Sequence, residues 1–237
     1  YVNYTWLKDG VVNQTGQVLV SAGQFNYTSL GYGNTTQGDN WTCQVTPYDG
    51  YAYGSSQNDS VVVDNCGMSL DQSLALGSDI DCSETAITIG ASNIVLDCAG
   101  FNITYSTSGV LSYGVYNNGF DNVTVKNCNI IEGNTTTESK YGINILNAEN
   151  SSVINNTIIT IGSVAHGIVY SNSSLNNVFN NTINTTGLVA YGIQFDNISN
   201  SLIINNSINT NGTLGVGIIL LANSDLNNII NNSITTS

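Results

Sequence analysis

A repeat of 25 residues constrains this chain more than any other feature of its sequence. Two motifs recur with it: the first has Gly-Ile or Gly-Val after a residue that is usually aromatic, and the second, Asn-Asn-Thr/Ser-Ile, begins at Asn155, Asn180, Asn205 and Asn231. Two motifs that stay in phase over several repeats predict a stacked solenoid. The copies of the first motif are Tyr141-Gly142-Ile143, His166-Gly167-Ile168, Tyr191-Gly192-Ile193 and Val216-Gly217-Ile218, with Tyr113-Gly114-Val115 lying 28 residues upstream.

Each repeat is long enough for three short strands joined by three turns. Residues one repeat apart then lie over one another. Stacked rings and amide-to-amide hydrogen bonds would stabilise successive coils, so we interpret the repeated residues as packing residues rather than ligands. The predicted columns are Tyr113, Tyr141, His166 and Tyr191; Asn147, Asn172, Asn197 and Asn223; and Asn156, Asn181, Asn206 and Asn232.

Two segments resemble known repeat proteins. Residues 92–100 (Ser-Asn-Ile-Val-Leu-Asp-Cys-Ala-Gly) and 121–128 (Asp-Asn-Val-Thr-Val-Lys-Asn-Cys) are similar to the repeats of right-handed parallel β-helix proteins, in particular of the NosD-like and carbohydrate-binding/sugar-hydrolase types. Such repeats are common in archaeal and bacterial surface proteins. The resemblance implies an all-β protein with a parallel β-helix of about six coils over residues 86–237. It implies little about activity.

Residues 1–64 follow a different pattern, with short strands expected at 2–7, 17–20, 41–47 and 60–63 and turns at 8–10, 31–33 and 48–50. This region resembles the latter part of an immunoglobulin-like β-sandwich. Trp6 stands for the core tryptophan, Cys43 for the second core cysteine and Trp41 for the corner tyrosine. The first core cysteine is missing, so we expect an incomplete sandwich. Its first strands were removed, or another chain supplies them, or Cys43 is a free thiol in a smaller sandwich.

Residues 65–85 are expected to cap the solenoid, because Leu70, Leu74 and Leu76 around Gly77 suit a short helix or turn over the first coil. A disulfide between Cys66 and Cys82 would hold this cap together. Cys98 and Cys128 occupy matching positions in successive coils, at a spacing that suits a disulfide. Cysteine use favours an oxidising compartment. The chain begins with Tyr1 rather than Met, which leads us to expect a processed product or a fragment.

Charge excludes several classes of partner. Charged residues make up only 8% of the chain, arginine is absent, three lysines are present and the net charge is −13. Nucleic acid binding and a polybasic membrane patch both need basic side chains. The longest apolar stretch, near residues 218–222, is too short to span a bilayer. We therefore expect no nucleic acid partner and no membrane insertion in this segment.

The chain contains 37 asparagines and 18 Asn-x-Ser/Thr sequons. This number predicts an extracellular or cell-surface protein with covalent N-glycans. Sequons such as those at Asn155 and Asn180 also have a simpler explanation, as by-products of an asparagine ladder. The candidates for glycosylation are Asn3, Asn13, Asn26, Asn34, Asn40, Asn58, Asn102, Asn122, Asn134, Asn150, Asn172, Asn184, Asn197 and Asn211.

No catalytic, cofactor-binding or metal site is expected. Polysaccharide lyases and hydrolases with this fold use basic residues or clustered carboxylates, whereas Lys140 reads as a solvated loop residue and His166 as a packing residue. Asp196 and Asp225 are isolated in the sequence. The resemblance to NosD implies copper binding, but one His, one Met and paired cysteines supply few soft ligands for that metal. Asp79, Asp81 and Glu84 suit Ca²⁺, although their spacing matches no calcium loop.

Three functions remain open. The leading hypothesis is a non-catalytic, glycosylated structural protein that self-assembles head-to-tail into a filament or surface appendage, because the last repeat lacks a cap and exposes strand edges. The alternative is an adhesin or carbohydrate-binding module that contacts environmental polysaccharide through Tyr48, Tyr51 and Tyr53. The third is a polysaccharide lyase or hydrolase.

Overall fold

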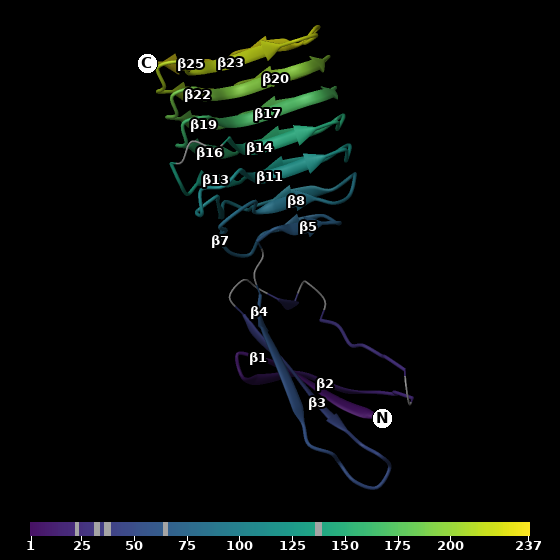
Figure 1. Cartoon of the computed structure of the whole chain (residues 1–237). Coiled ribbons are helices and arrows are strands. Elements are labelled where there is room, and N and C mark those ends of the chain that lie inside the picture. The colour runs from purple at the N-terminus through teal and green to yellow at the C-terminus, as the bar shows by residue number, and fades with distance from the viewer. Residues whose placement is uncertain (22–23, 31–33, 36–38, 64–65, 136–138) are drawn as a thin grey trace. The chain divides into compact units, whose positions relative to one another are not determined.

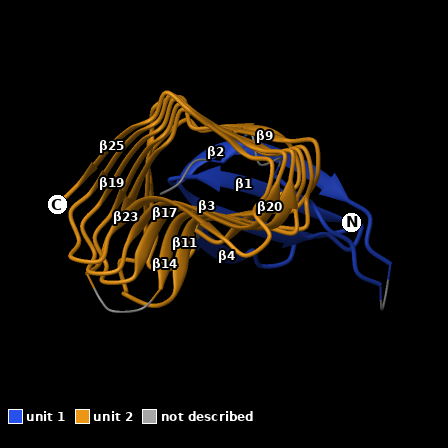
Figure 2. Ribbon diagram, turned by 90° about the horizontal axis from the view of Figure 1, so that it is seen from above, with its two compact units in different colours: residues 1–65 blue, residues 66–237 orange. Residues whose placement is uncertain are grey.

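The computed structural model describes residues 1–21, 24–30, 34–35, 39–63, 66–135 and 139–237. Over these ranges the chain is all-β and forms two compact units, residues 1–65 and 66–237 (Figure 2). No helix in the described ranges is long and apolar enough to cross a bilayer.

The first unit contains one antiparallel sheet with the strand order β2-β1-β3-β4. Asp9 and Gly10 both have positive φ, which suits the tight turn between β1 and β2. Compared with the sequence prediction, the second strand lies earlier and is longer, because Val11, Val12 and the polar residues that follow them pair with β1 despite their exposure. The strands are β1 (Val2–Lys8), β2 (Val11–Val18), β3 (Asn40–Pro47) and β4 (Gln57–Val62).

This sheet matches one layer of the expected immunoglobulin-like sandwich. Trp6 on β1 lies opposite Cys43 on β3, and Trp41 is fully buried. No second sheet covers this layer among the described residues. Instead, part of segment 24–30 lies against it, and Trp6 Nε1 donates a hydrogen bond to Thr28 Oγ1 at 3.5 Å. The unit is therefore a partial immunoglobulin-like domain, as the missing first cysteine predicts. The predicted turn at residues 31–33 lies outside the described residues.

The second unit is a β-helix made of three parallel sheets with seven strands each (Figure 1). Sheet I contains β5 (Met68–Leu70), β8 (Ile87–Ile89), β11 (Ser112–Asn118), β14 (Lys140–Leu146), β17 (Ala165–Ser174), β20 (Tyr191–Ser199) and β23 (Val216–Leu221). Sheet II contains β6 (Leu74–Ala75), β9 (Val95–Asp97), β12 (Thr124–Lys126), β15 (Ser152–Ile154), β18 (Asn177–Phe179), β21 (Leu202–Ile204) and β24 (Asn228–Ile230). Sheet III contains β7 (Ile80–Asp81), β10 (Asn102–Tyr105), β13 (Asn129–Glu132), β16 (Thr157–Thr160), β19 (Thr182–Thr185), β22 (Ser207–Thr210) and β25 (Ser233–Thr236).

The expected cap is itself the first coil of this β-helix. Strands β5, β6 and β7 pair with β8, β9 and β10, so residues 66–85 form neither a helix nor a separate cover. Leu70, Leu76 and Ile80 are buried in the core. Leu70 ends β5, Leu76 directly follows β6 and Ile80 begins β7, and these strands pair with the unpaired strand edges that the next coil offers.

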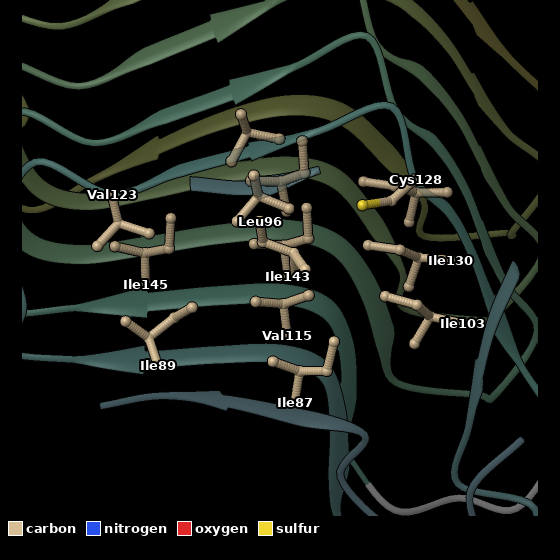
Figure 3. Packing of buried hydrophobic residues seen from close by; sticks show 14 of the residues in the cluster. Ile87, Ile89, Leu96, Ile103, Val115, Val123, Cys128, Ile130, Ile143 and Ile145 are labelled. Atoms are coloured by element: carbon tan, nitrogen blue, oxygen red, sulfur yellow. The ribbon is translucent and has the colours of Figure 1, made fainter. Parts of the chain in front are cut away.

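The core lies inside the coils, where equivalent residues stack. Figure 3 shows Ile87, Val115 and Ile143, which pair in register on neighbouring strands of sheet I. Gly142 of the repeated Tyr-Gly-Ile motif cannot carry a side chain, because a Cβ there would lie 2.5 Å from Ile158 Cγ2 and 2.7 Å from Gly167 O. The repeated glycine is thus a packing requirement at the corner between sheets III and I.

Candidate functional sites

The Asn-Asn dipeptides build a buried ladder at the turn between sheets II and III. The first residue of each pair, such as Asn155, has a positive φ that asparagine tolerates well. The second residue points inward: Asn181 Oδ1 accepts hydrogen bonds from Asn156 N at 2.9 Å and Asn156 Nδ2 at 3.0 Å. Asn206 Oδ1 bonds Asn181 in the same way. The predicted packing role of this column is confirmed.

The exposed asparagine column is less regular. Asn197 Nδ2 donates to Asn172 Oδ1 and Asn147 Nδ2 donates to Asn118 Oδ1, both at 3.0 Å. Sequence reasoning missed a further internal ladder at the turn between sheets I and II. There, the backbone N–H of one residue donates a hydrogen bond to the side chain of the equivalent Ser or Asn in the next coil. The spacing of about 25 residues between these Ser and Asn residues is the signal that could have revealed this ladder. This ladder contains Ser151, Asn176, Ser201 and Asn227.

The aromatic column forms as predicted. Its rings lie at centroid distances of 5.8 Å (Tyr113–Tyr141), 5.1 Å (Tyr141–His166) and 4.6 Å (His166–Tyr191). His166 Nδ1 accepts a hydrogen bond from Tyr191 N at 3.0 Å, so the neutral imidazole carries its proton on Nε2. Burial lowers the pKa of His166 to about 4. This histidine is a neutral packing residue at physiological pH.

Lys140 is wrongly predicted as a solvated loop residue, because its side chain is completely buried. Its Nζ lies 3.0 Å from Glu132 Oε1, whose side chain is also completely buried, and donates to Asn134 O at 2.8 Å. Glu132 Oε2 accepts hydrogen bonds from Ile161 N at 2.7 Å and Gly162 N at 2.9 Å. The carboxylate thus satisfies two backbone N–H groups of the next coil, and the ammonium neutralises it. Sequence reasoning missed Glu132 because an isolated acid carries no sign of its partner.

The remaining acidic candidates do not converge. Both carboxylate oxygens of Asp79 accept hydrogen bonds from Asn102, at 2.8 and 2.9 Å. Asp81 and Glu84 are exposed, as is Asp225, while Asp196 is half-buried on β20. Within the described ranges, no three His, Cys, Asp or Glu side chains are grouped so as to hold a metal ion.

The cysteines pair as predicted in the β-helix. Cys66–Cys82 and Cys98–Cys128 form disulfides with Cα separations of 5.4 and 4.7 Å. Cys128 stands where the buried ladder begins, and its N–H donates to Asn156 Oδ1 at 2.9 Å. Cys43 is a free, partly buried thiol, and burial raises its pKa.

The candidate glycosylation sites lie at the surface, but some of their amides are already used. Asn3, Asn102, Asn134 and Asn184 are half-buried, and the other ten candidates are exposed. The amide nitrogens of Asn122 and Asn150 donate to asparagine oxygens in the preceding coil. Asn13 and Asn58 instead lie exposed on β2 and β4, the two edge strands of the first unit.

The C-terminal coil exposes apolar residues that earlier coils bury. Ile234 is 47% exposed, whereas Ile208, its partner in the preceding coil, is 1% exposed. Ile229 is 44% exposed, whereas its partner Ile203 is fully buried. Equivalent residues of successive coils thus differ in exposure, because no described coil lies beyond β23, β24 and β25 (Figure 1).

The chain matches the model of a known family. The model of the family described as "Periplasmic copper-binding protein (NosD)" matches residues 32–237, most of the chain. The family is one of right-handed parallel β-helices, in agreement with the fold. Its description as periplasmic agrees with a location outside the cytoplasm. Comparisons with curated proteins and with solved structures find no match.

The residues of this chain do not fit the copper that the family description names. Its only histidine uses Nδ1 to accept the Tyr191 N–H and is stacked between two tyrosines. Its only methionine, Met68, packs against the hydrophobic core. Four of the five cysteines are in disulfides. Among the described residues, these side chains are thus engaged singly or in disulfides and are not grouped as a copper site needs.

Proposed function

This chain belongs to the NosD family of right-handed parallel β-helix proteins, and we propose that it is a non-catalytic structural protein outside the cytoplasm that assembles end to end with copies of itself. The observation that carries this proposal is the exposed apolar surface of the C-terminal coil. Burying Ile229 and Ile234 on a second copy would stabilise the contact by about 1 kcal/mol for each isoleucine, since each is about half exposed.

Strand edges at the same surface add hydrogen-bonding capacity. Ser233 N and Ser237 N donate to Asn206 O and Thr210 O of the preceding coil. Because alternate residues of a strand face opposite neighbours, Ile234 and Thr236 direct their N–H groups to the open edge. An edge strand of a second copy could pair with them by β-strand addition.

A non-catalytic role is supported by the bonding of the two residues best suited to acid–base chemistry. Lys140 is held in a buried ion pair and His166 in a ring stack, so neither meets a substrate from solvent. Turnover of an acidic polysaccharide by the purified protein, lost on substitution of Lys140 or His166, would contradict this part of the proposal.

Assembly is tested with the Thr236→Pro variant. Proline removes one open-edge N–H while leaving the bonds of Ser233 and Ser237 in place, and Thr236→Val is the matched control that keeps the N–H. We expect light scattering and negative-stain electron microscopy to show linear assemblies for the wild type and the valine variant, and mainly monomers for the proline variant. Wild-type protein that stays monomeric, or a proline variant that assembles equally well, would contradict the proposal.

We also propose that N-glycans occupy Asn13 and Asn58 on the edge strands of the first unit. A bulky sugar on an edge strand blocks pairing with other sheets, and it solvates a surface that carries few charges. Peptide mass spectrometry of native material should find sugar at these two sites. Unmodified peptides at both positions would contradict the proposal.

A further inference from the structure

Four tyrosines gather at the end of the first unit where β3 and β4 are joined. The Tyr48 ring lies between those of Tyr1 and Tyr53, at centroid distances of 4.8 and 4.7 Å. Tyr51, at the tip of the loop, is 96% exposed, and Tyr53 is 59% exposed. Single exposed aromatic side chains are normal, whereas a contiguous exposed apolar patch marks a candidate binding surface. Neither the core nor the stacking of coils uses these rings.

Hydrogen bonds hold the loop in one shape. Asp49 Oδ1 accepts from Tyr51 N at 2.8 Å and from Ala52 N at 2.9 Å, and these bonds lower the pKa of Asp49. Tyr48 Oη donates to Gly50 O at 2.9 Å, and Gly50 supplies the positive φ of the turn. A loop that is already ordered loses little conformational entropy when a ligand binds.

Position and composition both suit recognition. β3 corresponds to the strand that carries the second core cysteine, so the β3–β4 loop lies where immunoglobulin variable domains carry a binding loop. Residues 48–56 read Tyr-Asp-Gly-Tyr-Ala-Tyr-Gly-Ser-Ser. Tyrosine with glycine and serine is the composition of antibody binding loops, because tyrosine offers a large, rigid, amphipathic contact.

The size and charge of the patch limit its ligand. Tyr1, Tyr51 and Tyr53 together expose roughly 300–500 Å², well below the ~800 Å² that each partner contributes to a stable protein interface. Such an area suits a few sugar rings. Asp49 is the one charged residue in the loop, and Lys8, the only lysine of the unit, is paired with Asp39 at 2.8 Å. An acidic polysaccharide would therefore meet no free lysine or arginine side chain here, and the amino group of Tyr1 donates to Tyr48 O at 3.4 Å.

We propose that the tyrosines of the β3–β4 loop form a binding site for neutral polysaccharide. The apolar C–H face of a sugar ring would stack on Tyr51 or Tyr53, while the phenol hydroxyls bond sugar hydroxyls. This site is independent of end-to-end assembly, because it uses no residue of the C-terminal coil.

The full chain is tested on an array of neutral and acidic glycans, followed by affinity electrophoresis in soluble mannan and laminarin as neutral probes and polygalacturonate as the acidic probe. We expect binding to neutral glycans, about tenfold weaker for Tyr51→Ala and retained for Tyr51→Trp. Tyr27→Ala is the matched control, since Tyr27 is 87% exposed but lies outside the loop. No binding to neutral glycans, binding to acidic glycans alone, or equal losses for Tyr51→Ala and Tyr27→Ala would overturn the proposal.

Discussion

At the scale of single residues, the buried ion pair of Lys140 and Glu132 shows how a coil of unusual length is accommodated. The Glu132 carboxylate accepts hydrogen bonds from two backbone N–H groups of the following coil, and the Lys140 ammonium offsets its charge. Removing one partner of a buried pair leaves the other charge without compensation, which costs far more than losing a surface pair.

Lys140→Met should therefore lower the free energy of unfolding by about 3–5 kcal/mol. Lys126→Met is the matched control, because Lys126 forms a partly exposed pair with Asp97 at 3.1 Å, and its loss should cost at most about 1 kcal/mol. Urea unfolding followed by circular dichroism measures both. Equal effects of the two substitutions would mean that the interior ion pair is solvated.

His166 makes stability depend on pH. Its folded-state pKa of about 4 lies below the unfolded value of 6.5, so between these pH values the unfolded chain binds a proton that the folded chain does not. Stability should fall by about 2 kcal/mol from pH 7.5 to pH 5 through this residue. His166→Tyr, which places the usual residue of the column there, should remove this part of the pH dependence. Parallel stability curves for the two proteins would contradict the shifted pKa.

At the scale of strands and turns, the Cys98–Cys128 disulfide stands at the end of the asparagine ladder. Replacing both cysteines by alanine removes the link across 30 residues and should cost about 3–4 kcal/mol. The Cys98→Ala, Cys128→Asn variant should recover about 1–2 kcal/mol, because an amide at position 128 can donate to Asn156 Oδ1 as the later asparagines do. Thermal unfolding compares the two variants. Equal stability would mean that the ladder cannot be extended by this position.

Strands in the later coils follow from the sequence because two motifs fix every register. The strands of the first coil could not be predicted in this way, since β6 and β7 have only two residues each and give no periodic pattern. The aromatic and buried asparagine columns are predictable from their spacing. Lys140 is not, because its burial depends on Glu132, which precedes it by eight residues and shares no motif with it. The tyrosine loop is visible as composition, but its ring contacts depend on how β1 and β3 pair.

At the scale of the whole molecule, the two units differ in how much they bury. The hydrophobic core cluster lies wholly within residues 66–237, as do both disulfides. Trp41 is the one fully buried apolar side chain among the described residues of the first unit. A small sheet with so little core is marginally stable, so the first unit should unfold before the β-helix.

Tryptophan fluorescence can follow that event alone, because Trp6 and Trp41 are the only tryptophans of the chain and both lie in the first unit. In increasing urea, we expect the tryptophan emission to shift to the red at a lower concentration than the loss of the far-ultraviolet dichroism of the β-helix. Coincident transitions would show that the chain unfolds as one cooperative body.

Every regular coil is 25 residues long and forms the same pattern of hydrogen bonds with the next coil. Internal gene duplication can therefore change the length of the β-helix. Inserting one more unit would displace everything beyond it by about 4.8 Å and would require no new side-chain fit. Selection on length can therefore act in whole steps, without passing through misfolded intermediates.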